Sequence, residues 1–92
     1  MKYLDWNEEK NNILKRERNI SFEEIELAIA NGGLIETILH PNQDKYPGQK
    51  LFFVNINNYI YTVPFIEDKN KIFLKTIYPD RIATKIFLGE KK

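Results

Sequence analysis

The feature that constrains the fold most is a pair of apolar stretches separated by two asparagines. Residues 50–56 and 59–66 are rich in β-branched and aromatic side chains, and Asn57 and Asn58 can adopt the positive φ angles of a two-residue hairpin turn. Such a turn fixes the register of the two strands, so one face of the hairpin should be strongly apolar and the other mixed. The expected pairs are Ile56 with Tyr59, Val54 with Tyr61 and Phe52 with Val63.

Two helices are expected before this hairpin. Asn7 is a suitable N-cap for the first, with Trp6 as an apolar anchor just before it. The sequence Ser-Phe-Glu-Glu at residues 21–24 forms a capping box, in which serine and glutamate side chains each bond a free backbone N–H, and therefore predicts the start of the second. Gly32 and Gly33 should end that helix.

The rest of the chain predicts a strand at residues 34–40, a loop at 41–48, a strand at 71–78 and a last helix that Pro79 begins. Apolar residues at helical spacing give that helix one expected buried side, made of Ile82, Ala83, Ile86 and Phe87. The predicted class is α+β, in the order α-α-β-β-β-β-α. Its four-stranded, mainly antiparallel sheet should have helices on the apolar face and a partly open polar face.

Length and composition favour one domain over residues 1–92, since the chain is 42% hydrophobic and too short to bury two cores. It contains no cysteine, which excludes disulfides and zinc–thiolate sites and makes the reducing cytoplasm the simplest expectation. No stretch approaches the ~20 apolar residues of a membrane helix, and no cluster of metal-ligating residues stands out. We expect no metal and no cofactor.

The charges are distributed unevenly. A net charge of +1 argues against a protein that coats nucleic acid through bulk electrostatics. Residues 69–92, however, carry seven Lys/Arg against two Asp/Glu, a sum of +5, whereas residues 1–30 and 31–68 each sum to −2. We therefore expect the functional surface in the last quarter of the chain.

Three short motifs occur in order along the chain: residues 6–11 (WNEEKN), 20–24 (ISFEE) and 81–85 (RIATK). With these motifs at this spacing, the chain resembles the BrnT-type toxins of bacterial type II toxin–antitoxin systems. The resemblance implies a RelE-like fold, ribonuclease activity that blocks translation, and a ribbon-helix-helix antitoxin as partner. It implies RNA as substrate, free or on the ribosome, contact with promoter DNA only through the antitoxin complex, and no membrane partner.

The chain departs from the family pattern at two places. Arg18 precedes the ISFEE motif where the family commonly has a histidine, and the last strand carries Lys71 and Lys75 where the family usually has more arginines. These departures favour weaker catalysis.

RNA cleavage by a 2′-OH requires groups that move protons and cations that stabilise the transition state. In RelE-like enzymes Lys, Arg and Tyr take these roles. Our catalytic candidates are Lys75, on the expected open face, and Arg81, whose guanidinium can bind a phosphate through two hydrogen bonds. His40 is a candidate acid or base because imidazole titrates near neutrality. Candidate RNA-binding residues are Lys71, Lys85, Arg18 and Tyr78.

Each candidate also has a simpler explanation, as a solvated surface cation, an incidental loop histidine or a tyrosine of the core. Two other function classes stay open. One is a related module that binds an antitoxin or nucleic acid without cleaving RNA. The other is a small structural or interaction protein unrelated to toxins.

Overall fold

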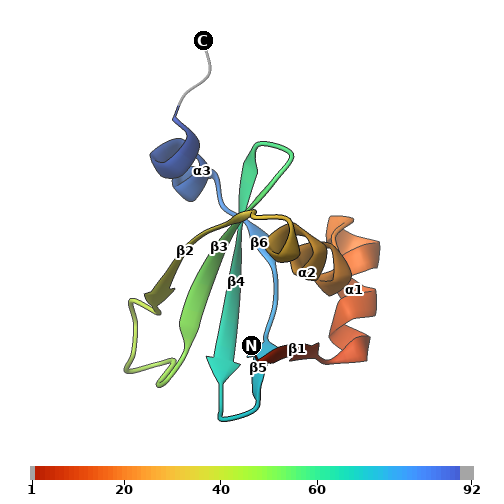
Figure 1. Cartoon of the computed structure of the whole chain (residues 1–92), viewed down its shortest axis with the longest axis vertical. Coiled ribbons are helices and arrows are strands. Elements are labelled where there is room, and N and C mark those ends of the chain that lie inside the picture. Colours follow the sequence, from red (N-terminus) through yellow and green to blue (C-terminus); the bar gives the residue numbers. More distant parts are fainter. Residues whose placement is uncertain (1, 90–92) are drawn as a thin grey trace.

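The computed structural model describes residues 2–89, which form a mixed α+β structure (Figure 1). This confirms the predicted class, although the chain begins with a strand and not with a helix. The elements are, in order, β1 (Tyr3–Trp6), α1 (Glu8–Arg18), α2 (Phe22–Ala30), β2 (Leu34–Leu39), β3 (Lys50–Ile56), β4 (Tyr59–Glu67), β5 (Lys71–Leu74), β6 (Tyr78–Pro79) and α3 (Arg81–Leu88).

The sheet has the strand order β1-β5-β4-β3-β2, and β6 pairs with the first half of β4. β1 and β5 run parallel, and the other pairs are antiparallel. The hairpin prediction is confirmed, since Asn57 and Asn58 have φ angles of 54° and 64°. The register is the predicted one, with Ile56 opposite Tyr59, Val54 opposite Tyr61 and Phe52 opposite Val63.

The prediction of a four-stranded sheet was wrong, because six strands are present in the described residues. β1 has only four residues and becomes a strand through parallel pairing with β5, a contact that local pattern does not reveal. The predicted strand at 71–78 is divided into β5 and β6. Lys75 donates its N–H to the Pro64 carbonyl at 2.8 Å, but Pro64 has no N–H to return, so the ladder is interrupted there.

α1 and α2 cover one face of the sheet, which we call the core face. The predicted N-caps are confirmed, since Asn7 accepts from the Lys10 N–H at 2.9 Å and Ser21 accepts from the Glu24 N–H at 3.2 Å. The capping box is only half formed, because the Glu24 carboxylate accepts from the Ser21 hydroxyl at 3.2 Å and not from a backbone N–H. α2 ends at Ala30, just before the two glycines. The core between these helices and the sheet includes Leu14, Ile20, Phe22, Ile25, Phe52, Val54, Val63 and Phe65.

Asn11 joins the two helices, a role that the sequence pattern did not reveal. Its side chain is fully buried and accepts a hydrogen bond from the Phe22 N–H at 2.8 Å. The same amide donates to Glu23 at 2.7 Å and to Glu8 at 3.2 Å. The hydrogen bond from Asn11 is the main cause that lowers the pKa of Glu23.

α3 lies against the opposite face of the sheet, which we call the second face, so this face is less open than predicted. Ala83 is buried, and Phe87 packs on Phe53 of β3 with 5.2 Å between ring centroids. The prediction that Ile82 and Ile86 are buried was wrong, because they are 72% and 70% exposed. The helix is rotated toward the sheet through Ala83 and Phe87, which leaves the two isoleucines outside.

Candidate functional site

Three residues of the last quarter lie beside alternate residues of β4. They are Phe73 beside Ile66, Lys75 beside Pro64 and Tyr78 beside Thr62. Because these three β4 positions alternate with the core residues of the same strand, they belong to the second face. At about 3.3 Å per residue the row extends roughly 13 Å along the strand.

Lys71 and Lys75 lie on either side of one aromatic ring. Their Nζ atoms are 5.9 Å and 5.8 Å from the centroid of Phe73, close enough for a cation–π contact. The structure therefore brings together a catalytic candidate and an RNA-binding candidate. Phe73 was not a candidate, and its alternation with Leu74 of the core was the signal that could have identified it.

The two lysines differ in how their charge is compensated. Lys71 forms an ion pair with Asp5 of β1 at 3.2 Å, and this contact raises the pKa of Lys71. Lys75 is exposed and forms no ion pair with any residue that the structure describes. The positive charge at this end of the second face thus depends mainly on Lys75.

Tyr78 is half-buried at the other end of the row. Burial raises the pKa of its hydroxyl, and the Asp80 carboxylate and the neighbouring Tyr46 act in the same direction. Like an ordinary tyrosine, Tyr78 is protonated at neutral pH and can donate a hydrogen bond to a bound anion.

Asp80 organises the start of α3. Its carboxylate accepts from the Thr62 hydroxyl at 2.7 Å and from the Ala83 N–H at 2.9 Å. The N-cap aspartate therefore occupies the helix terminus where a phosphate could otherwise bind backbone N–H groups.

Arg81 is the first residue of α3 and is exposed. Within residues 2–89 it makes no hydrogen bond or ion pair, so its guanidinium is available to a ligand. Lys85 lies one turn further along the helix and is also exposed. Arg81 follows directly after the aspartate bonded to Thr62, which places it at the Tyr78 end of the row.

Arg18, at the end of α1, is fixed by a structural contact. Its guanidinium donates to the Ile77 carbonyl at 2.5 Å, just before β6. This contact brings Arg18 near the backbone of Tyr78, and it holds the segment between β5 and β6 against the helix.

His40 begins the loop between β2 and β3. Its Nδ1 accepts from the Asn42 N–H at 3.0 Å, so this ring nitrogen is already used as an acceptor. The ring lies against Tyr46, with 4.4 Å between centroids. The loop leaves β2 at Leu39 and enters β3 at Lys50, which lies opposite Phe65 of β4, so both ends of the loop are at the Phe73 end of the row.

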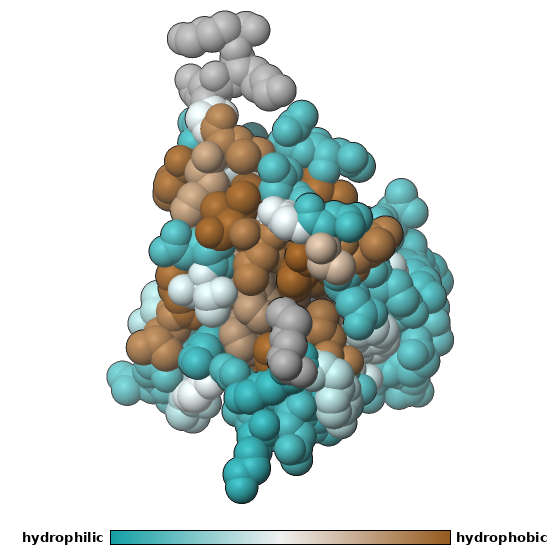
Figure 2. Space-filling view, in the orientation of Figure 1, coloured by the Kyte–Doolittle hydropathy of each residue, from teal (hydrophilic) through white to brown (hydrophobic). Residues whose placement is uncertain are grey.

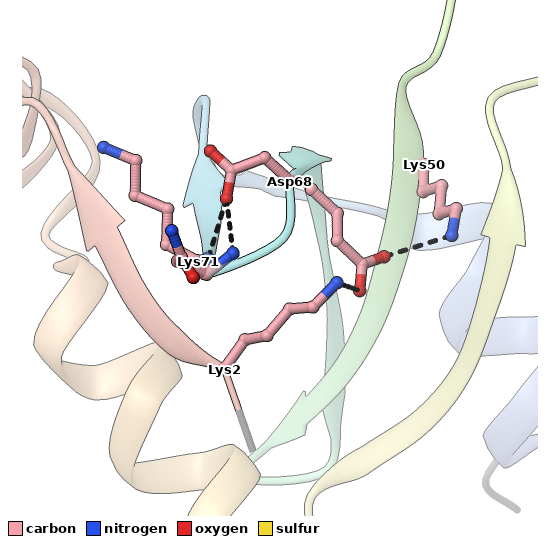
Figure 3. Close-up of polar contacts among 6 residues, drawn as sticks. Lys2, Lys50, Asp68 and Lys71 are labelled. Atoms are coloured by element: carbon pink, nitrogen blue, oxygen red, sulfur yellow. Dashed lines mark hydrogen bonds and ion pairs between the residues drawn. The ribbon is translucent and has the colours of Figure 1, made fainter.

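A second charged cluster lies at the opposite end of β4 (Figure 3). Glu67 accepts from Lys2 at 2.7 Å and from Lys50 at 3.1 Å, and these contacts lower its pKa. Asp68 accepts the backbone N–H groups of Asn70 and Lys71 at 2.8 Å and 2.9 Å. This cluster ties three strands and a turn together, and its cations are already paired.

Comparisons with protein-family models, with curated proteins and with solved structures found no match for this chain. Within the described part of the chain, no group of three or more His, Asp or Glu residues could hold a metal ion. No helix among residues 2–89 is long and apolar enough to cross a membrane.

Proposed function

We propose that the chain is the toxin of a type II toxin–antitoxin system. It is a BrnT-type endoribonuclease with a RelE-like fold that cleaves RNA in the cytoplasm. A ribbon-helix-helix antitoxin neutralises it. The observation that supports it most is the arrangement of Lys75 and Arg81. Both are cations without an ion-pair partner in the described residues, and in the chain they lie three residues before and three residues after the half-buried Tyr78.

In this proposal Lys75 and Arg81 hold the scissile phosphate and stabilise the charge that develops on it. Tyr78, whose hydroxyl is protonated at neutral pH as in an ordinary tyrosine, donates a hydrogen bond to the same group. His40 belongs to the neighbouring loop and can accept a proton only after it releases the Asn42 N–H. Lys71 and Lys85 add contacts to the RNA backbone, and Arg18 acts through the segment that carries Tyr78.

A binding module without catalysis is the second candidate, and the two aspartates favour it. Asp5 neutralises Lys71, and Asp80 fills the start of α3, so the surface holds less positive charge than the sequence suggested. Such a surface can bind an antitoxin or RNA while lacking the charge that strong transition-state stabilisation requires.

The test is cleavage of a labelled RNA by the purified chain in the presence of a chelator, together with growth on induction. We expect cleavage and growth arrest in the wild type, and a loss of about 10²-fold or more in Arg81→Gln and Lys75→Gln. Lys69→Gln is the matched control, because Lys69 is an exposed cation of the same basic segment.

A folded wild-type chain that neither cleaves RNA nor arrests growth would refute the enzyme. Binding of RNA without cleavage would support the second candidate.

A further inference from the structure

The outer surface of α3 is the most exposed apolar feature of the described chain. Ile82 and Ile86 are 72% and 70% exposed, although each lies on a helix that is otherwise packed on the sheet. We call these two residues the isoleucine stripe. Figure 2 shows hydrophobic side chains gathered at the end of the molecule where α3 lies, while α1 is covered by hydrophilic ones.

The isoleucine stripe borders a shallow depression of about 340 Å³. Its floor is apolar and is formed by Ile38, Phe53 and Phe87. The one carboxylate at its end, that of Asp80, already accepts two hydrogen bonds from the protein. A partner's apolar side chain can therefore enter the depression without burying an unpaired charge.

A basic stripe runs beside the isoleucine stripe. Arg81 and Lys85 are exposed and lie four residues apart, as Ile82 and Ile86 do, so the two pairs form parallel lines on the outer side of one helix. A partner must therefore match apolar contacts along the isoleucine stripe and, beside it, the positive charge of Arg81.

The apolar stripe and the neighbouring positive charge together determine which kind of partner fits this surface. A second copy packed through its own α3 offers no carboxylate to Arg81, because residues 81–88 contain no Asp or Glu. An added strand cannot pair with α3, because a helix does not present the extended row of N–H and C=O groups that strand pairing requires. A helix with apolar residues four apart and carboxylates on one flank fits both lines.

We propose that α3 is a docking surface for an acidic amphipathic helix of a partner protein. The helix lies along the isoleucine stripe, inserts an apolar side chain into the depression, and places its carboxylates against Arg81. The proposal concerns a protein contact and stands whether or not the chain cleaves RNA.

The experiment titrates the full chain into a fluorescently labelled helical peptide of about 20 residues, long enough to hold a helix. The peptide carries leucines four residues apart with glutamates on one flank, and a second peptide carries lysines in place of the glutamates. We expect the acidic peptide to bind, with Ile82→Ser/Ile86→Ser weakening binding at least about tenfold. Leu27→Ser on α2 is the matched control, since Leu27 is 63% exposed.

Arg81→Glu should reverse the preference, so that the lysine peptide binds better than the acidic one. Circular dichroism confirms that each variant is folded. The proposal is overturned if the acidic peptide does not bind at millimolar concentration, if both peptides bind the wild type equally, or if the isoleucine variant binds as the wild type does. Sedimentation that shows a dimer broken by Ile82→Ser/Ile86→Ser would assign the surface to a second copy and also overturn it.

Discussion

Replacing Asn11 with alanine should destabilise the fold strongly, because this one amide joins α1 to α2. The Phe22 N–H would lose its acceptor in a place that water does not reach, which costs about 1–3 kcal/mol. The lost hydrogen bonds to Glu8 and Glu23 add about 1 kcal/mol, since both carboxylates are exposed and return to water. We expect a total loss of about 2–4 kcal/mol in the free energy of unfolding.

Urea denaturation followed by Trp6 fluorescence measures this loss, because Trp6 stacks on Phe22 with 5.5 Å between centroids. At about 1.3 kcal/mol per molar urea, the midpoint should fall by about 1.5–3 M. Asn12→Ala is the matched control, since the neighbouring asparagine is exposed, and its change should stay within about 0.5 kcal/mol.

Asn11→Asp keeps the acceptor for Phe22 but places a carboxylate against Glu8 and Glu23. It should be destabilised at neutral pH and recover as acid protonates these groups. The reasoning is refuted if Asn11→Ala costs no more than Asn12→Ala, or if the deficit of Asn11→Asp does not depend on pH.

Three further outcomes are expected. Asn58→Gly should stabilise the chain by about 0.5–1 kcal/mol in urea denaturation, because Asn58 has a φ of 64° that glycine adopts without strain, and no gain would contradict this. Gly33→Ala should cost about 2 kcal/mol or more, because the added Cβ would lie 2.8 Å from the Asn55 carbonyl oxygen; an unchanged melting temperature would exclude this clash. The pKa of Glu23 is lowered from 4.5 in the folded chain, so the stability it contributes is present above pH 4.5 and is lost as pH falls through the folded value. Asn11→Ala should flatten that acid dependence, and a steeper one would contradict the assignment.

Features that depend on neighbours in the chain could be predicted from the sequence. The hairpin turn at Asn57 and Asn58, its register, and the caps at Asn7 and Ser21 each follow from a few adjacent residues, and all are confirmed. β1 could not be predicted, because four residues carry too weak a pattern until β5 supplies a partner.

The orientation of α3 shows a different limit. Its apolar residues form one broad stripe, so spacing alone could not decide which edge of that stripe faces the sheet. The decision rests on tertiary contacts, namely the Thr84 hydroxyl accepting from the Ile60 N–H at 2.8 Å and Phe87 packing on Phe53. Ile82 and Ile86 were consequently assigned to the wrong side.

The charge distribution of the candidate site also depends on contacts between residues that are far apart in the sequence. The sequence placed a charge of +5 in residues 69–92, of which residues 90–92 lie outside the described part, but it could not show where opposite charges would meet them. Folding brings Asp5 to Lys71 and sets Asp80 at the start of α3, while Lys75 and Arg81 have no ion-pair partner among the described residues. The positive charge that this surface can offer to RNA therefore depends on two individual cations, Lys75 and Arg81. For that reason single substitutions at those two positions, and not changes of net charge, discriminate between an enzyme and a binding module.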